Sequence, residues 1–152
     1  MTHAVPPTGF LRLVVGYDGS PPASRALDAA TRLLQGRVGS IHVVYVAHLS
    51  SLVMMSPGAI AEMESDFDEI EQELRATAAG QLRASGAAWE FERRQGVVAD
   101  ELIAVSTAIR DAHADQTVVI VVGSSSHAGH RMVGSVAVSL ARRSPVPLVI
   151  VP

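Results

Sequence analysis

Two segments of the chain combine small and polar residues with the end of an apolar run, and this combination can bind an anion. The longer segment, Gly123 to Ser135, follows the β-branched run Val118–Val122 and precedes a helical pattern. A loop of this kind offers backbone N–H groups and the positive end of a helix dipole to a phosphate group. Its 12 residues from Gly123 to Gly134 exceed the roughly 2–6 usual for a strand-to-helix connection. The length favours a phosphate site over an ordinary polar connection.

Several residues of this loop are candidates for direct contact with the anion. Gly123 permits a sharp exit from the strand, and Gly134 and Ser135 open the helix. The full candidate set is Gly123, Ser124, Ser126, Gly129, Gly134, Ser135 and Val136. His127 and His130 have the spacing of a metal pair, but no carboxylate lies in the same stretch, so solvated histidines are the favoured interpretation.

The shorter segment, Gly16 to Ser20, joins the first predicted strand to the first predicted helix, and its candidates are Gly16, Tyr17 and Asp18. Ligands of an open α/β sheet bind outside the carboxyl ends of the strands, where the strand order reverses. Both segments would therefore face one crevice if the first and fourth strands are neighbours. Asp18 could accept hydrogen bonds there from an adenine amino group or a ribose hydroxyl. An Asx turn beside the helix start is the slightly favoured alternative.

The elements that must position these segments alternate between strand and helix patterns. Residues 1–9 have no periodicity and are expected to form a flexible leader, so residues 10–152 make one domain. Strands are expected at Leu11–Gly16, Ile41–Ala47, Trp89–Arg94, Val118–Val122 and Val146–Val151. Helices are expected between Ser20 and Gly36, over about residues 59–85, and at Val98–Ala112 and Ser135–Arg143. In the longest of them the acidic run from Glu62 to Glu73 is interpreted as a solvated face. Its apolar stripe is Ile60, Met63, Phe67, Ile70, Leu74, Ala78 and Leu82. This alternation predicts βαβ units and a mostly parallel sheet with helices on both faces.

Composition excludes several classes of function. The chain has 152 residues, 48% of them apolar, and a formal charge of −3, which gives no electrostatic case for nucleic acid. Zero cysteines exclude disulfides and cysteine-based zinc sites. No apolar stretch has the roughly 18 residues of a membrane span, and the start MTHAVPPTGF does not resemble a secretory signal. A cytoplasmic protein is expected.

The chain resembles the universal stress protein family from about Leu11 to Pro152. Three pieces carry the resemblance: LRLVVGYDGSPPASRALDAA, IHVVYVAH and VVIVVGSSSHAGHRMVGSVAVSLARRSPVPLVIVP. It implies an open parallel five-stranded sheet in the order 3-2-1-4-5, with helices on both faces. Many members bind ATP through the motif G-x2-G-x9-G-[S/T]. By this resemblance Asp18 lies beside the adenine, the backbone of Val46 contacts the base, Gly123 and Gly134 are the first and third glycines, and Ser135 lies at the phosphates.

The chain departs from that motif at its centre. Ser126 stands at the second glycine position, and Gly134 comes two residues too early. Serine lacks the freedom of glycine at positive φ, and Gly129 lies in a different register. The adenine end of the site is therefore better supported than the phosphate end. The resemblance implies ATP, another adenine nucleotide such as cyclic AMP, and Mg²⁺ only together with a nucleotide.

Three functions follow, and they differ in class. The leading hypothesis is a stress-response regulator that binds an adenine nucleotide without turnover, because no general base or magnesium-binding acidic pair stands beside the phosphate loop. The alternative is a dimeric protein-interaction module in which the phosphate loop has degenerated. Weak hydrolysis through His127 or His130 is the least favoured. The apolar last strand, Val146 to Val151, is expected at a sheet edge, and the resemblance implies a homodimer through it.

Overall fold

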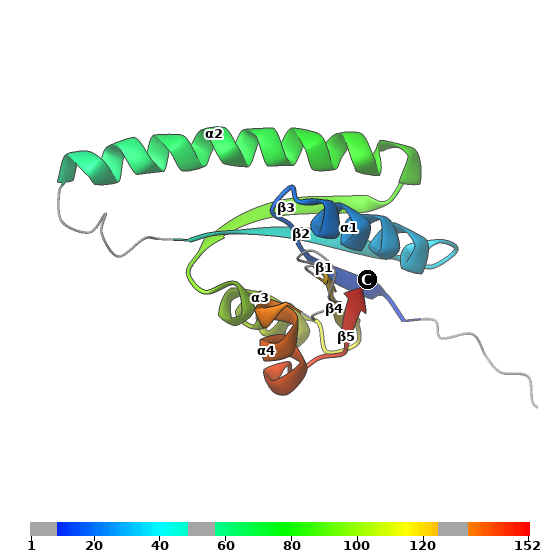
Figure 1. Cartoon of the computed structure of the whole chain (residues 1–152). Helices are drawn as coiled ribbons and strands as arrows, with labels where there is room; N and C mark the ends of the chain where they lie inside the picture. Colours follow the sequence, from blue (N-terminus) through cyan, green and yellow to red (C-terminus); the bar gives the residue numbers. More distant parts are fainter. Residues whose placement is uncertain (1–8, 49–56, 125–133) are drawn as a thin grey trace, which may run out of the picture.

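The computed structural model describes residues 9–48, 57–124 and 134–152. All five of its strands are parallel and form one sheet in the order β3-β2-β1-β4-β5 (Figure 1). The strands are β1 (Leu11–Gly16), β2 (Gly39–Ala47), β3 (Ala88–Gln95), β4 (Thr117–Gly123) and β5 (Leu148–Val151). The predicted fold and strand order are thus confirmed, and β1 and β4 are neighbours. The expected leader falls almost wholly on residues 1–8, outside the described residues.

Helices cover both faces of the sheet. They are α1 (Pro21–Leu34), α2 (Pro57–Leu82), α3 (Val98–Ala112) and α4 (Ser135–Arg143), with a 3-10 turn, η2 (Arg83–Ser85), after α2. Helices α1 and α2 lie on one face and α3 and α4 on the other (Figure 1). None of the helices among the described residues is both long and apolar enough to cross a bilayer. The molecule is a three-layer α/β domain with the sheet in the middle.

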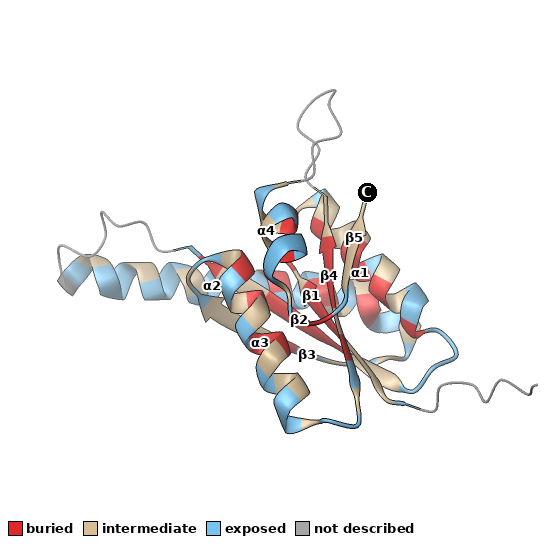
Figure 2. Ribbon diagram, turned by 90° about the horizontal axis from the view of Figure 1, so that it is seen from below, coloured by how far each residue is buried: buried red, intermediate tan, exposed pale blue. Residues whose placement is uncertain are grey.

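The pleat of each strand divides the core between the two faces. In β1, Leu13 and Val15 pack with α1 and α2, whereas Val14 packs with α3 and α4. Strand β4 alternates in the same way, and its core residues are buried on both faces (Figure 2). A central parallel strand is covered on both sides, which explains its continuous β-branched run. The same alternation determines which side chains reach each face at the carboxyl ends of the strands.

The start and end of α1 follow the predicted signals. Ser20 is the N-cap, its Oγ accepts the N–H of Ala23 at 3.3 Å, and Pro21 occupies the first helical position. Gly19 before it has a φ of +78°, as a turn glycine requires. The helix ends at Leu34, just before Gly36.

The last strand is two residues shorter than predicted. Strand β5 begins at Leu148, and Val146 lies buried in a turn before it. The Ser144 hydroxyl donates to the Val146 carbonyl at 2.7 Å and accepts the Val146 N–H at 3.3 Å. These bonds occupy the polar backbone groups of Val146, so the residue cannot join the ladder despite its β-branched side chain.

The two edges of the sheet differ in character. Strand β5 is short and carries four aliphatic residues, each partly exposed. Strand β3, at the other edge, packs Trp89 and Phe91 on the α2 face and carries four charged residues. These charged residues are Glu90, Glu92, Arg93 and Arg94. Charged side chains are a common protection of an edge strand against pairing with another sheet.

Helix α2 is only partly packed on the sheet. Its C-terminal half buries Leu74, Ala78 and Leu82 against the core. Its N-terminal half extends past the carboxyl ends of β2 and β3 (Figures 1 and 2). There the apolar stripe predicted from the sequence lies partly in solvent, with Ile60 39% and Ile70 40% exposed.

Candidate functional site

A cavity of about 210 Å³ opens at the carboxyl ends of β1 and β4. Its walls come from the β1–α1 connection, the ends of β2 and β4, and the first turns of α3 and α4. The lining residues are Gly16, Tyr17, Asp18, Ser20, Pro22, Ala23, Val44, Val46, Val98, Leu102, Val122, Gly123, Gly134, Ser135, Val136 and Ala137. The cavity lies where the strand order reverses, which is the expected position for a ligand in an open α/β sheet.

The structure brings together most of the predicted site residues. Eight of them line the cavity: Gly16, Tyr17, Asp18, Val46, Gly123, Gly134, Ser135 and Val136. Ser124 does not line it; its N–H donates to the Val151 carbonyl at 2.7 Å and so extends the pairing of β4 with β5. Ser126 and Gly129 lie outside the described residues, as do His127 and His130.

The sequence analysis missed the apolar floor of the cavity. Val44, Leu102 and Val122 form it, and all three belong to the core cluster on the α3 and α4 face. Strand alternation could have identified Val44, because it lies two residues before Val46 and faces the same side. Leu102 could not have been found in this way, since only the packing of α3 brings it to the sheet.

Asp18 forms the Asx turn that was the favoured alternative. The backbone N–H of Ser20 donates to Asp18 Oδ1 at 3.0 Å, and the residue is exposed. A carboxylate has about four lone-pair sites, so one such bond leaves capacity to accept others. Asp18 also lines the cavity, at the rim between β1 and α1. The turn therefore holds the carboxylate in place at the mouth of the cavity.

The first turn of α4 presents backbone N–H groups at the cavity. Gly134 is the N-cap residue, with φ −60° and ψ 158°, and no side chain caps the helix among the described residues. By contrast, Ser20 caps α1 with its own hydroxyl. The first N–H groups of a helix have no acceptor within it, and together with the dipole they favour an anion. The first N–H groups of α4 thus have no side-chain acceptor in the described part of the chain, whereas in α1 the hydroxyl of Ser20 accepts one of them.

Two glycines allow the cavity walls to approach each other closely. A Cβ on Gly123 would collide with the backbone carbonyl group of Pro22 in the first turn of α1. A Cβ on Gly16 would lie 3.1 Å from Leu102 Cδ1 and 3.3 Å from Val122 Cγ1. Gly123 therefore has a packing role that holds whether or not a ligand binds.

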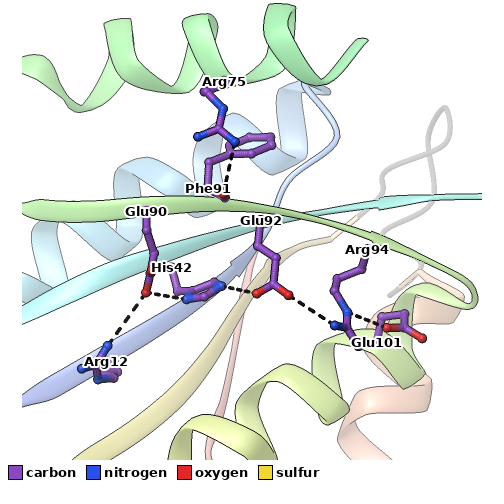
Figure 3. A network of polar contacts seen from close by, with 8 residues as sticks. All are labelled: Arg12, His42, Arg75, Glu90, Phe91, Glu92, Arg94 and Glu101. Carbon is purple, nitrogen blue, oxygen red and sulfur yellow. Dashed lines mark hydrogen bonds and ion pairs between the residues drawn. The ribbon is translucent and has the colours of Figure 1, made fainter. Parts of the chain in front are cut away.

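A polar network on the same sheet face positions the α3 wall (Figure 3). Arg94 Nε donates to Glu101 Oε2 at 2.9 Å, which ties the first turn of α3 to β3. The hydrogen bond with Glu101 raises the pKa of Arg94, despite some opposition from burial. Gly96 has a φ of +143° in the intervening turn, and a Cβ there would lie 2.9 Å from Glu101 Oε1. The link fixes Val98 and Leu102, which both line the cavity.

His42 of β2 lies at the centre of this network and is buried. Its Nδ1 is 2.8 Å from Glu90 Oε1 and its Nε2 is 2.7 Å from Glu92 Oε2 (Figure 3). Arg12 adds a longer ion pair to Glu90 at 3.9 Å. Within the described ranges, no group of three or more histidine, cysteine or acidic side chains could hold a metal ion. The network is a cluster of polar contacts that joins β1, β2 and β3.

The two tyrosines at this end of the sheet belong to the opposite face. Tyr17 is 3% exposed, and its hydroxyl is the one buried side-chain polar atom in the described part of the chain without a hydrogen-bond partner. Tyr45 packs beside the same cluster. Burial raises the pKa of Tyr45, Arg93 opposes this shift, and Asp18 adds to it.

Comparisons with known proteins agree with this architecture. The family model described as "Universal stress protein family" matches residues 9–152. The structure of UspA from Lactobacillus plantarum is 16% identical with a TM-score of 0.70, over 95% of this chain and 99% of that chain. No curated protein sequence matches the chain.

Two similar structures were solved with adenine nucleotides. A universal stress protein in complex with cAMP is 23% identical with a TM-score of 0.62, over 95% of this chain and 98% of that chain. The universal stress protein from Archaeoglobus fulgidus in complex with dAMP is 19% identical with a TM-score of 0.57, over the same shares. At these identities the likeness establishes the fold, and the family model covers nearly all of the sequence. The chain belongs to the universal stress protein family.

Proposed function

We propose that this protein binds an adenine nucleotide in the cavity between β1 and β4. The uncapped first turn of α4 at the cavity carries the proposal, because it offers N–H groups and a positive dipole to phosphate. The apolar floor of Val44, Leu102 and Val122 suits the face of a purine ring. The carboxylate of Asp18 at the rim accepts hydrogen bonds from the amino group or the ribose.

The relatives support the choice of ligand. Two similar structures hold cAMP and dAMP, which share the adenine base and one phosphate group. The described cavity of about 210 Å³ is smaller than the roughly 300–1,000 Å³ of a typical ligand site. It accommodates the nucleoside portion, and the phosphate lies at its open end toward α4.

Asp18→Asn tests the site because asparagine keeps the Asx turn and removes the negative charge. We expect calorimetry to detect saturable binding of ATP, ADP or cyclic AMP by the wild-type chain. Asp18→Asn should weaken it by roughly tenfold, since hydrogen bonds to a charged acceptor contribute about 1.5–3 kcal/mol. Asp111→Asn, an exposed aspartate at the end of α3, is the matched control and should leave the affinity unchanged. Absence of heat with every nucleotide would refute the proposal.

We further propose that the nucleotide acts as a regulatory ligand in the cytoplasm rather than as a substrate. Asp18 has the one acidic side chain among the described cavity residues, and it already accepts the Ser20 N–H. A single such carboxylate is a poor site for Mg²⁺, so any Mg²⁺ enters with the nucleotide. Bound nucleotide recovered unhydrolysed after prolonged incubation would agree with this role, and rapid release of phosphate would contradict it.

We propose a homodimer through β5. The strand pairs on one side with β4, and its four aliphatic side chains are partly exposed at the sheet edge. Light scattering of the full chain at micromolar concentration should give twice the monomer mass of 16.0 kDa. A mass that stays at one chain at the highest concentration reached would contradict the dimer.

The second candidate is a protein-interaction module without a nucleotide. Ser126 at the second glycine position and the shortened loop favour it, because both reduce the freedom of a turn around phosphate. The calorimetric experiment separates the two candidates, since an interaction module without a nucleotide site should give no heat of binding with any nucleotide.

A further inference from the structure

The exposed half of α2 has the pattern of a coiled-coil strand. Its apolar residues alternate at intervals of three and four, which is the a and d spacing of a heptad. They are Ile60, Met63, Phe67, Ile70 and Leu74. Only the last of these is buried, at 9% exposure, whereas Ile60 and Ile70 are 39% and 40% exposed. The sheet covers Leu74 but not the N-terminal part of the stripe, so those side chains become buried only when another surface lies along them.

The residues that flank this seam are all acidic. The positions on either side of it, e and g of the heptad, hold Glu64, Asp66, Glu71 and Glu73. Glu71 is engaged by Arg75 and Arg93, and no ion pair among the described residues involves the other three. Residues 62–73 contain seven acidic residues and no basic one. The sequence analysis assigned these acids to a solvated face, but at e and g they border the apolar seam.

Two contacts between α2 and β3 lie beside this seam. Arg75 stacks on the Phe91 ring at 5.0 Å and donates to the Phe91 carbonyl at 3.4 Å (Figure 3). Arg93 of β3 donates to Asp68 at 2.6 Å. Asp68 is at position b of the heptad, outside positions a and d, so this ion pair is made beside the seam and not across it. These contacts join the middle of α2 to strand β3.

We propose that the seam from Ile60 to Ile70 docks a helix of another protein that carries lysine or arginine beside its own apolar stripe. Charge complementarity selects this partner, because charges at e and g determine which coiled-coil helices pair. A second copy of the chain would place acidic residues opposite acidic residues, which is destabilising. The surface lies on the α2 side of the sheet, away from the cavity, and the proposal does not require that a nucleotide binds.

A synthetic helix of about three heptads, with Ile at a, Leu at d and Lys at e and g, is the probe. A matched peptide with Glu in place of Lys is its control; like charges keep each peptide from pairing with itself. With each peptide fluorescently labelled, we expect its fluorescence anisotropy to show saturable binding of the lysine peptide only. Added salt should weaken this binding. Hydrogen exchange should slow in the first half of α2 when the lysine peptide is present.

The matched variants separate docking from general attraction to an acidic surface. Ile60→Gln with Ile70→Gln should weaken binding at least roughly tenfold, which is about 1.4 kcal/mol. Leu33→Gln on α1, also 40% exposed, should leave binding unchanged. Both variants should keep the wild-type circular dichroism spectrum, because the replaced side chains are exposed.

Three results would overturn the proposal. The first is no saturable binding of the lysine peptide at about millimolar concentration. The second is equal binding by the wild-type chain and the double isoleucine variant, which would mean attraction by charge alone. The third is a lower assembly mass of the double variant in light scattering, which would make the seam a contact between copies of this chain.

Discussion

Gly123→Ala is expected to destabilise the fold by about 3 kcal/mol or more, whether or not a nucleotide is bound. The added Cβ would collide with the carbonyl group of Pro22, which is backbone in the first turn of α1 and cannot rotate away. The end of β4 or the start of α1 must shift, and both carry core residues. Urea unfolding followed by circular dichroism measures the change in the free energy of unfolding.

Gly80→Ala is the control for this experiment. Gly80 lies within α2, and no heavy atom would come within 4 Å of a Cβ there. Alanine should therefore raise the stability by about 0.5–1 kcal/mol, because it favours helix over the unfolded chain. If Gly123→Ala kept wild-type stability and lost only nucleotide affinity, the packing role of Gly123 would be wrong and a purely ligand-binding role would replace it.

Gly134→Asp is expected to reduce the affinity for AMP or ATP by roughly a hundredfold, equivalent to about 2.7 kcal/mol. Aspartate at the N-cap accepts the N–H groups of the first turn and places a negative charge where the phosphate would lie. The backbone at Gly134, with φ −60° and ψ 158°, is accessible to any residue. The same substitution should raise the stability of the protein by a few tenths of a kcal/mol.

Adenosine and a second aspartate variant serve as controls for Gly134→Asp. Adenosine has no phosphate, so its affinity should not change. Val138→Asp adds the same charge on an exposed position of α4, beyond the first turn, and should reduce phosphate affinity only slightly. Equal affinity of wild type and Gly134→Asp for AMP would show that the first turn of α4 is not the phosphate site.

The sequence predicted strands and helices well wherever neighbouring residues determine them. The β-branched runs became β1, β2 and β4, and the Ser20 and Gly36 signals bounded α1 correctly. The start of β5 was wrong, because the hydroxyl of Ser144 competes for the backbone of Val146. The strand order came from the family resemblance, since no local pattern reports which strands are neighbours.

The candidate site was predicted less completely, because it depends on contacts between residues that are far apart in the sequence. Glycine at position 123 suggested a ligand-binding turn, and only the fold reveals its contact with Pro22. The stripe on α2 was predicted correctly as apolar, yet periodicity cannot tell what covers a stripe. Its N-terminal part proved to be partly exposed, because α2 extends past the ends of β2 and β3 (Figure 1).

The unequal edges of the sheet bear on how far an assembly of this protein can grow. A pair joined through β5 is isologous, because each copy contributes the same strand. Its two outer edges are then both β3, where Glu90, Glu92, Arg93 and Arg94 oppose further strand addition. In the proposed dimer, assembly would therefore end at a closed pair instead of continuing into a fibre. The charged edge at β3 would thus limit the assembly that the apolar edge at β5 allows.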